Sequence, residues 1–381
     1  MWSNGEMADV TIPAGFQPPP YPYDRLRELQ AIADALPGGR VDLSIGTPCD
    51  APPDAVVAAL GSSGSERSYP LSLGSAAYRD AAAGWLERRF GVSVPAAQVA
   101  ACVGSKELVA GLPHWLRLRS PARDTVLYPA VSYPSYEMGA TLAGCRAVAV
   151  PLDDRWRIDV SAIDPADAAR ALCLWVNTPG NPAGGIDDLA AVAAWGRAHD
   201  VPVFSDECYI EFTWDGPPQT ILAHGTEGVV AVHSLSKRSN LAGVRAGFYA
   251  GDAELVSYLG ELRKHAGFLV PGPVQAAAVV AWADDAHVDV QRERYRSRLV
   301  RLREILAGIG VDAPMPGGAF YLWPEAPDGD AWAFAHRLAA DAGVIVSPGE
   351  FYGPTASGHV RFALVVPDDR LDLIAARLGT A

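Results

Sequence analysis

The chain has 381 residues, of which 49% are hydrophobic and 20% are charged, so disorder along the whole chain is excluded. Its 31 basic and 44 acidic side chains give a net charge of −13, which disfavours binding to nucleic acid or to an anionic membrane surface. At roughly 100–200 residues per domain, the length predicts two domains.

The cysteines and the apolar runs bear on the cellular compartment. The five cysteines are an odd number, with neither a CxxC pair nor a metal-ligand spacing, which favours a reducing compartment and no metal site. No apolar run reaches the roughly 18 residues that a membrane-spanning helix needs, and residues 1–15 lack the apolar core of a secretory signal. We therefore expect a cytoplasmic protein without a membrane partner.

The first part of the chain alternates between short β-rich runs and longer helical stretches. After a Pro-rich extended segment at 17–22 and a helical spacing over 24–36, helices are expected over stretches such as 76–89, 189–199 and 253–263. Strands are expected over 41–45, 99–103, 125–128, 147–150, 171–176, 201–205, 229–233 and 246–250. Several of these runs are almost wholly apolar, so an α/β fold with a mostly parallel sheet between helices is predicted.

The pattern changes after about residue 275. A charged helix is predicted over 287–306, followed by a strand at 319–323, a helix to 342, strands at 344–346 and 360–364, and a last helix. This is an α+β segment of about 100 residues. We therefore predict an N-terminal arm (1–45) that joins a smaller C-terminal domain (276–381), with a large domain between them (46–275).

Polar segments follow two of the predicted strands, where ligands bind in open α/β sheets. Gly104 and Ser105 follow the strand at 99–103 and begin a helix whose free N–H groups suit a phosphate. The segment 177–185 follows the strand at 171–176 and is rich in Asn, Pro and Gly, which hold its amides in fixed directions. Each segment alone is also consistent with an ordinary helix cap or turn.

Charged residues next to apolar strands indicate a functional site more strongly than these polar segments do. Asp206 follows the strand at 201–205, where a carboxylate needs a cationic partner or caps a helix. Lys237 follows the strand at 229–233 between Ser, Arg and Gly residues that suit a phosphate and a reactive carbonyl. Arg361 lies within the apolar strand at 360–364, as a clamp for a carboxylate would.

Taken in order, these residues resemble the class I/II aminotransferases, the pyridoxal-phosphate enzymes of fold type I, over nearly the whole chain from about Tyr23. The most specific motif is Ser234-x-Ser236-Lys237-x(7)-Arg245-x-Gly247. Asn181-Pro182-x-Gly184, Asp206-x-x-Tyr209 and Arg361 also fall where that family has them. The resemblance implies a large domain with a mostly parallel, seven-stranded sheet between helices, plus a smaller α+β domain.

The resemblance also implies pyridoxal 5'-phosphate as the cofactor and a role for each matching residue. Lys237 would form the Schiff base with the cofactor and then act as the base. Asp206 would pair with the pyridine nitrogen, and Asn181 and Tyr209 would bind the phenolic oxygen. The residues expected at the phosphate are Ser105, Lys106, Ser234, Ser236 and Arg245, and those expected to stack on the ring are Tyr133 or, as second choice, Tyr136.

The substrate and the partner subunit follow from the same resemblance. Arg361 would bind the substrate α-carboxylate, helped by Gly46 and Asn181. Tyr69 matches a tyrosine that reaches the phosphate of the neighbouring subunit, which implies a homodimer with shared active sites.

Within the family, the sequence is most similar to the actinobacterial succinyldiaminopimelate aminotransferases of lysine biosynthesis. It departs from their pattern at Gly180, Arg238 and Val244, among other positions. We expect a ping-pong transfer between glutamate/2-oxoglutarate and an anionic amino acid, N-succinyl-LL-2,6-diaminopimelate. The candidate cations for the distal carboxylate are Arg238, Arg263 and Lys264.

Two other readings stay open on these residues. One is a pyridoxal-phosphate enzyme that acts on a different amino acid, as an aminotransferase or a C–S lyase, because the same cofactor supports elimination. The other is a regulator that only senses its ligand through an aminotransferase-like domain. The charge of −13 disfavours the regulator, since such proteins usually also bind DNA.

Overall fold

The computed structural model describes residues 15–380, so the first 14 residues of the predicted N-terminal arm, which are nearly all of the segment tested for a signal, lie outside it. A seven-stranded sheet forms the centre, in the order β2-β8-β7-β6-β5-β3-β4. β8 is antiparallel to both of its neighbours, and the other neighbouring pairs are parallel. The strands are β2 (Val99–Cys102), β3 (Thr125–Pro129), β4 (Arg146–Val150), β5 (Ala171–Asn177), β6 (Val203–Asp206), β7 (Val229–Ser234) and β8 (Gly247–Gly251). The α/β prediction and its seven strands between 99 and 250 are confirmed.

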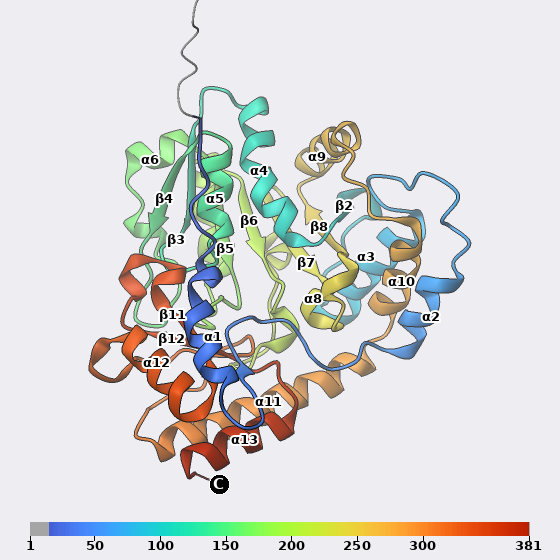
Figure 1. The fold of residues 1–381 in the computed structure, drawn as a ribbon. Helices are drawn as coiled ribbons and strands as arrows, with labels where there is room; N and C mark the ends of the chain where they lie inside the picture. Colours follow the sequence, from blue (N-terminus) through green and yellow to red (C-terminus); the bar gives the residue numbers. More distant parts are fainter. Residues whose placement is uncertain (1–14, 381) are drawn as a thin grey trace, which may run out of the picture.

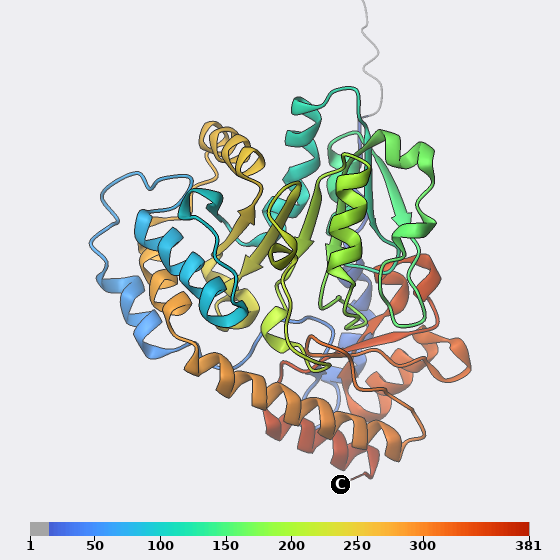
Figure 2. The same cartoon turned by 180° about the vertical axis from the view of Figure 1, so that it is seen from behind.

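Successive residues of these buried strands point to opposite faces of the sheet and belong to two hydrophobic cores, one on each face. Ala101, Val203 and Ala231 belong to the core beneath α3 (Ala76–Phe90), α7 (Leu189–Ala198) and α10 (Gly272–Ala283). Cys102, Phe204 and Val232, the next residues along, belong to the core beneath α4 (Ser105–Arg119), α5 (Ser135–Leu142) and α9 (Ala253–Ala266). Figure 1 shows α4 and α5 in front of the sheet, and Figure 2 shows the opposite face. Two further helices of this part are α2 (Asp54–Ser62) and α6 (Pro165–Arg170).

A separate hydrophobic core joins the two ends of the described chain. Leu29, Val41, Leu302, Phe334 and Ile374 all belong to it. The helices around it are α1 (Arg27–Asp34), α11 (Ala286–Gly308), α12 (Ala331–Ala342) and α13 (Asp368–Leu378), and α11 runs along the lower edge of the molecule beside α13 (Figure 1). Its sheets contain β1 (Val41–Asp42) with β10 (Val344–Ile345), and β11 (Ser347–Pro348), β12 (Val360–Ala363) and β9 (Tyr321–Leu322).

The strand predicted over 41–45 needs correcting. Only Val41 and Asp42 are in strand conformation, and they pair with β10 rather than with the central sheet. Val41 and Leu43 are apolar because they are buried in the hydrophobic core that joins the two chain ends, and not because they belong to the central sheet.

Three central parallel strands end side by side, and each ends on a polar residue. Asn177 ends β5, Asp206 ends β6 and Ser234 ends β7, and Asn177 and Asp206 are register partners. The carboxyl ends of parallel strands meet at one edge of a sheet, so these side chains face the same space.

Candidate active site

A cavity of about 450 Å³ opens at this edge of the sheet. The residues predicted from the sequence to bind the cofactor or the substrate α-carboxylate line it, with one exception: Gly46, Ser105, Lys106, Tyr133, Tyr136, Asn181, Asp206, Tyr209, Ser234, Ser236, Lys237, Arg245 and Arg361. The exception is Tyr69. The lining comes from the strand ends, the start of α4, the segment after β1, and β9 and β12, so both parts of the chain build the cavity.

Lys237 projects into the cavity from α8 (Leu235–Arg238), which follows β7 directly. Ser234 caps this short helix, because its side chain accepts a hydrogen bond from the backbone N–H of Ser236 at 3.1 Å. The Lys237 ammonium donates to the carbonyl oxygen of Gly46. Burial lowers the pKa of Lys237 to about 8, so a larger share of this amine is neutral near physiological pH than for an ordinary lysine. A buried, partly neutral lysine is suited to attack a carbonyl group.

Asp206 is buried at the cavity, and its carboxyl group has two hydrogen-bond donors among the described residues. Its Oδ2 accepts the Tyr136 hydroxyl at 3.0 Å, and its Oδ1 accepts the backbone N–H of Cys208 at 3.3 Å. Burial raises the pKa of the Asp206 carboxyl. Both hydrogen-bond partners are neutral, so the carboxylate is set up to receive a cation from within the cavity.

The residues between β2 and α4 face Arg245 and form an anion site. Gly104 has a φ of 73°, and a Cβ at this position would lie 2.2 Å from a terminal nitrogen of Arg245. Ser105 is the first residue of the fifteen-residue helix α4, whose free N–H groups favour negative charge. Arg245 Nη1 donates to Ser236 Oγ at 3.3 Å, and the hydroxyls of Ser234 and Ser236 are 3.0 Å apart. A helix N-terminus, a guanidinium and hydroxyl groups together suit a phosphate.

Arg361 lies at the other end of the cavity on β12 and is only 2% exposed. Its Nη1 donates to Asn181 Oδ1 at 2.7 Å, and its Nη2 donates to the Ser44 carbonyl and, at 3.4 Å, to the Tyr23 hydroxyl. Within residues 15–380 its Nε has no hydrogen-bond partner. The guanidinium carbon lies 4.3 Å from the centre of the Tyr321 ring. All of these partners are neutral, so the guanidinium charge is left for a ligand.

Tyr209 and Asn181 are held in place by other residues of the lining. The hydroxyls of Tyr209 and Tyr321 are 2.7 Å apart. Asn177 Oδ1 accepts the backbone N–H of Asn181 at 2.8 Å, and Asn177 Nδ2 donates to the Asp206 carbonyl at 2.9 Å. Asn177 therefore ties the Asn181 loop to the end of β6.

The sequence reasoning missed part of the lining. Tyr21, Tyr23, Thr47, Cys208 and Tyr321 all face the cavity. Tyr21 stands in the Pro-rich segment at 17–22, Tyr23 directly follows it, and Tyr321 stands in the predicted strand at 319–323. Their aromatic rings are the signal that could have drawn attention to them, although aromatic residues in such places usually serve packing.

Tyr69 is 96% exposed and does not line the cavity of its own chain. Its proposed contact with the phosphate of a second subunit therefore stays a prediction.

Of the three candidate cations for a distal carboxylate, Arg238 and Arg263 are wrong, whereas the exposed Lys264 stays a prediction. Arg263 is fully buried and its Nη1 donates to Glu107 at 2.9 Å, and Arg238 is paired with Glu211 and Asp285. Lys264 lies 3.7 Å from Glu261 on α9, and none of the three is among the residues that line the cavity within the described chain. Buried arginines need carboxylate partners, and here these come from segments far away in the sequence.

Comparison with known proteins agrees with this geometry. The fold matches solved aminotransferases of fold type I, and here a buried lysine follows β7 while Asp206, which ends the neighbouring β6, has no charged hydrogen-bond partner among the described residues. Residues 39–378 match the model of the family aminotransferase class I and II, and the chain belongs to this family. It is therefore a pyridoxal-phosphate-dependent aminotransferase, which acts on amino acid and oxo acid substrates.

Two relatives cover most of the chain. It is 41% identical to 4-dedimethylamino-4-oxo-anhydrotetracycline transaminase OxyQ of Streptomyces rimosus, over 94% of this chain and 99% of the relative. It is 35% identical to an LL-diaminopimelate aminotransferase of Desulforudis audaxviator, over 93% of both chains.

Two solved structures are similar as well. An aminotransferase from Neisseria meningitidis superposes with a TM-score of 0.87 at 31% identity, over 95% of this chain and 98% of the other. A probable N-succinyldiaminopimelate aminotransferase from Thermus thermophilus gives a TM-score of 0.84 at 30% identity, over 94% and 100%. In the described part of the chain, no helix is long and apolar enough to cross a membrane.

Proposed function

We propose that this aminotransferase moves an amino group between glutamate/2-oxoglutarate and an anionic amino acid, N-succinyl-LL-2,6-diaminopimelate. The anionic class rests on Arg361, which is buried at the cavity and, among residues 15–380, has only neutral hydrogen-bond partners and an Nε without any partner. A buried guanidinium of this kind gains most from two parallel hydrogen bonds to a carboxylate. The solved neighbour from Thermus thermophilus, a probable N-succinyldiaminopimelate aminotransferase, supports the substrate.

A succinylated substrate carries further carboxylates, and Lys106 is our candidate for one of them. The basic residues of the described lining are Lys106, Lys237, Arg245 and Arg361. If Lys237 and Arg245 serve the cofactor and Arg361 the α-carboxylate, Lys106 is the one left. Its ammonium lies 5.2 Å from the Tyr21 ring centre and 5.4 Å from that of Tyr133. Its backbone, in the first turn of α4, remains free to serve the phosphate.

A second substrate class has its own support. The lining includes Tyr21, Tyr23, Tyr133 and Tyr321, whose rings suit a large, flat partner. OxyQ, named as acting on a 4-oxo-anhydrotetracycline, is 41% identical to this chain. A ketone on a large aromatic ring system is therefore our alternative amino acceptor, and a different amino acid of another pathway is the alternative amino donor.

The donor set of the cavity fits pyridoxal 5'-phosphate. The anion site of Ser105, Ser236 and Arg245 suits the phosphate, and Lys237 suits the aldehyde. Asp206, without a charged partner of its own, suits a protonated pyridine nitrogen. When bound, the cofactor supplies the electron-withdrawing ring that makes a substrate Cα–H acidic.

Each residue then has a defined task. Arg361 and Asn181 orient the substrate by its α-carboxylate, and the Gly46 backbone supports it. Lys237 takes the proton from Cα and returns it during the transfer, which its pKa of about 8 favours. Asp206 keeps the pyridine nitrogen protonated, and Tyr209 with Asn181 donates hydrogen bonds to the phenolic oxygen. Tyr133 covers one face of the ring, and Tyr136 orients Asp206 through its hydroxyl.

The assembly and compartment are part of the proposal. We propose a homodimer in which the exposed Tyr69 of one subunit completes the site of the other. We propose that residues 276–381, with the N-terminal arm, act as a small domain beside the cofactor-binding domain. Five free cysteines fit a cytoplasmic location.

Substrate profiling of the purified enzyme tests the proposal. N-succinyl-LL-2,6-diaminopimelate should be used with 2-oxoglutarate at least tenfold more efficiently than N-acetylornithine, LL-diaminopimelate or uncharged amino acids. Preference for an uncharged aromatic substrate would favour the second class instead. Release of ammonia and a 2-oxo acid from a sulfur amino acid without any amino acceptor would indicate a lyase.

A further inference from the structure

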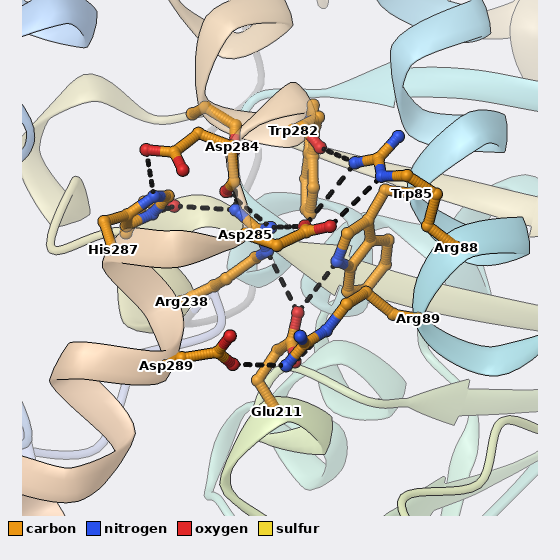
Figure 3. Close-up of polar contacts among 12 residues, drawn as sticks. Trp85, Arg88, Arg89, Glu211, Arg238, Trp282, Asp284, Asp285, His287 and Asp289 are labelled. Carbon is orange, nitrogen blue, oxygen red and sulfur yellow. Dashed lines mark hydrogen bonds and ion pairs between the residues drawn. The ribbon is translucent and has the colours of Figure 1, made fainter.

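The residue after the active-site lysine is an arginine whose side chain points away from the cavity. Arg238 is 2% exposed, and Figure 3 shows it enclosed between α3, α10 and the start of α11. The rings of Trp85 and Trp282 lie 5.4 and 5.2 Å from its guanidinium carbon. A buried charge at this place is costly unless every donor is satisfied.

Every N–H group of Arg238 has an acceptor. Nε donates to Glu211 Oε1 at 3.2 Å. Nη1 donates to Ser239 Oγ at 3.2 Å and to the Ala281 carbonyl at 2.7 Å. Nη2 donates to the Asp284 carbonyl at 3.1 Å and to Asp285 Oδ1 at 2.9 Å. A guanidinium has five such donors in a fixed plane, so this set of acceptors holds it in one orientation.

These acceptors come from three different segments. Glu211 lies on η4 (Ile210–Phe212), two residues after Tyr209, and also accepts Trp85 Nε1 at 2.8 Å and Arg89 Nη2 at 2.8 Å. Ala281 is in the last turn of α10. Asp285 precedes α11, the long helix that leads to the second core. Arg238 therefore joins the lysine segment to the tyrosine segment and to the joint between α10 and α11 (Figure 3).

The short helix that carries the lysine depends on such anchors. α8 has four residues, too few to hold its own shape in isolation. Its start is fixed by the Ser234 cap, and its last residue is Arg238. Fixing Arg238 fixes the backbone of Lys237 next to it, and with it the direction of the amine.

We propose that Arg238 is a positioning residue for Lys237: its five hydrogen bonds lock α8 so that the amine stays buried and aimed into the cavity. The proposal rests on the role given to Lys237 above. Lysine cannot replace Arg238, because one ammonium cannot reach acceptors on three segments at once. With the lock loosened, the Lys237 amine gains water, and its pKa rises from about 8 toward the ordinary value for lysine.

The test uses Arg238→Lys and two readouts. In the cofactor-free enzyme, the pH dependence of Lys237 labelling by an amine reagent, followed by peptide mass analysis, reports the pKa of the amine. It should rise in Arg238→Lys. In the loaded enzyme, kcat should fall roughly 10–100-fold while KM for glutamate changes less than about threefold, as expected for a residue that touches no substrate.

Arg298→Lys is the matched control. Arg298 is 4% exposed and grips Asp50 through Nη1 at 2.7 Å and Nη2 at 2.9 Å, but it belongs to α11 and does not line the cavity within the described chain. The Arg298→Lys variant should lower thermal stability about as much as Arg238→Lys, while the pKa of Lys237 and kcat stay unchanged. An unchanged pKa and kcat in Arg238→Lys would overturn the proposal, and so would equal shifts in both variants.

If Arg238→Lys does not fold, the same two readouts are measured in Asp285→Asn. This change is milder, because the Asp285 side chain is 24% exposed and only one of the five hydrogen bonds of Arg238 is weakened. A smaller shift in the same direction supports the lock, and no shift refutes it. Lys237→Ala separates the two levels of the account. If that variant keeps its turnover, the proposed function fails. If it loses turnover while Arg238→Lys and Asp285→Asn behave as wild type, only the positioning role fails.

Discussion

Arg361 Nη1 donates a hydrogen bond to Asn181 Oδ1 at 2.7 Å, although 180 residues separate the two in the chain. The contact joins β12, in one part of the molecule, to the loop after β5 in the other. Asn181 orients the guanidinium without neutralising it, since an amide oxygen carries no charge. Arg361 therefore brings an intact charge to the cavity lining, and its buried Nε has no hydrogen-bond partner within residues 15–380.

Arg361→Lys should weaken both amino donors, because both carry the α-carboxylate that Arg361 is proposed to bind. Losing one charge-assisted hydrogen bond costs about 1.5–3 kcal/mol, which corresponds to a rise in KM of roughly 10–150-fold. Steady-state kinetics with glutamate and with the second donor measure this. Normal constants for both donors would refute the clamp. A Lys106→Ala variant should instead weaken the succinylated donor more than glutamate.

Asp206→Asn should retain the cofactor but lose most of the activity. The amide keeps the shape and can still accept the Tyr136 hydroxyl, but it lacks the charge that holds a proton on the pyridine nitrogen. Turnover should fall by at least about 100-fold, while the cofactor dissociation constant changes about tenfold or less. Absorbance titration with the cofactor, beside kinetics, separates the two effects. Equal losses in binding and turnover would contradict this role.

Gly104→Ala should damage phosphate binding. The added Cβ would lie 2.2 Å from a terminal nitrogen of Arg245, and the backbone φ of 73° is unfavourable for alanine. Arg245 must then move away from Ser236, so affinity for the cofactor should fall at least about tenfold. Gly243→Ala is the control, because no atom lies within 4 Å of a Cβ built there. Similar affinities in both variants would mean that the anion site lies elsewhere.

Tyr69 tests whether the active sites are shared between subunits. Tyr69→Ala should weaken cofactor binding, although the side chain is 96% exposed in the single chain. Mixing this variant with Lys237→Ala subunits should restore activity, since a hybrid dimer contains one site with both native residues. The mixture is assayed at limiting cofactor after subunit exchange. Activity no greater than that of the separate variants would exclude a contribution of Tyr69 in trans.

The strands and the sites at their ends could be predicted because both leave local patterns. The runs from 171 to 176 and from 229 to 232 are apolar throughout. Asp206 directly follows the predicted strand at 201–205, and Lys237 comes four residues after the strand at 229–233. A charged side chain beside an apolar, buried strand has no favourable place in a hydrophobic core. Such a residue therefore indicates a functional role even before a structure is known.

The partners of buried arginines could not be predicted in the same way. Arg238 and Arg263 read as free cations because their carboxylates, Glu211 and Glu107, come from other segments of the chain. Tyr321 was missed for the opposite reason, since an aromatic residue in an apolar strand is typical of a core. Its hydroxyl contact with Tyr209 depends on how the two parts of the chain pack together.

A single variant tests whether Lys237 is the reactive amine of this aminotransferase. The purified wild-type protein should be yellow through its bound cofactor. Lys237→Ala should lose that absorption band and lose turnover by several orders of magnitude, because the nucleophile and the proton-transfer group are the same amine. The transfer of an amino group from glutamate, measured beside the visible spectrum, gives both results. A Lys237→Ala protein with near-normal turnover would contradict the account.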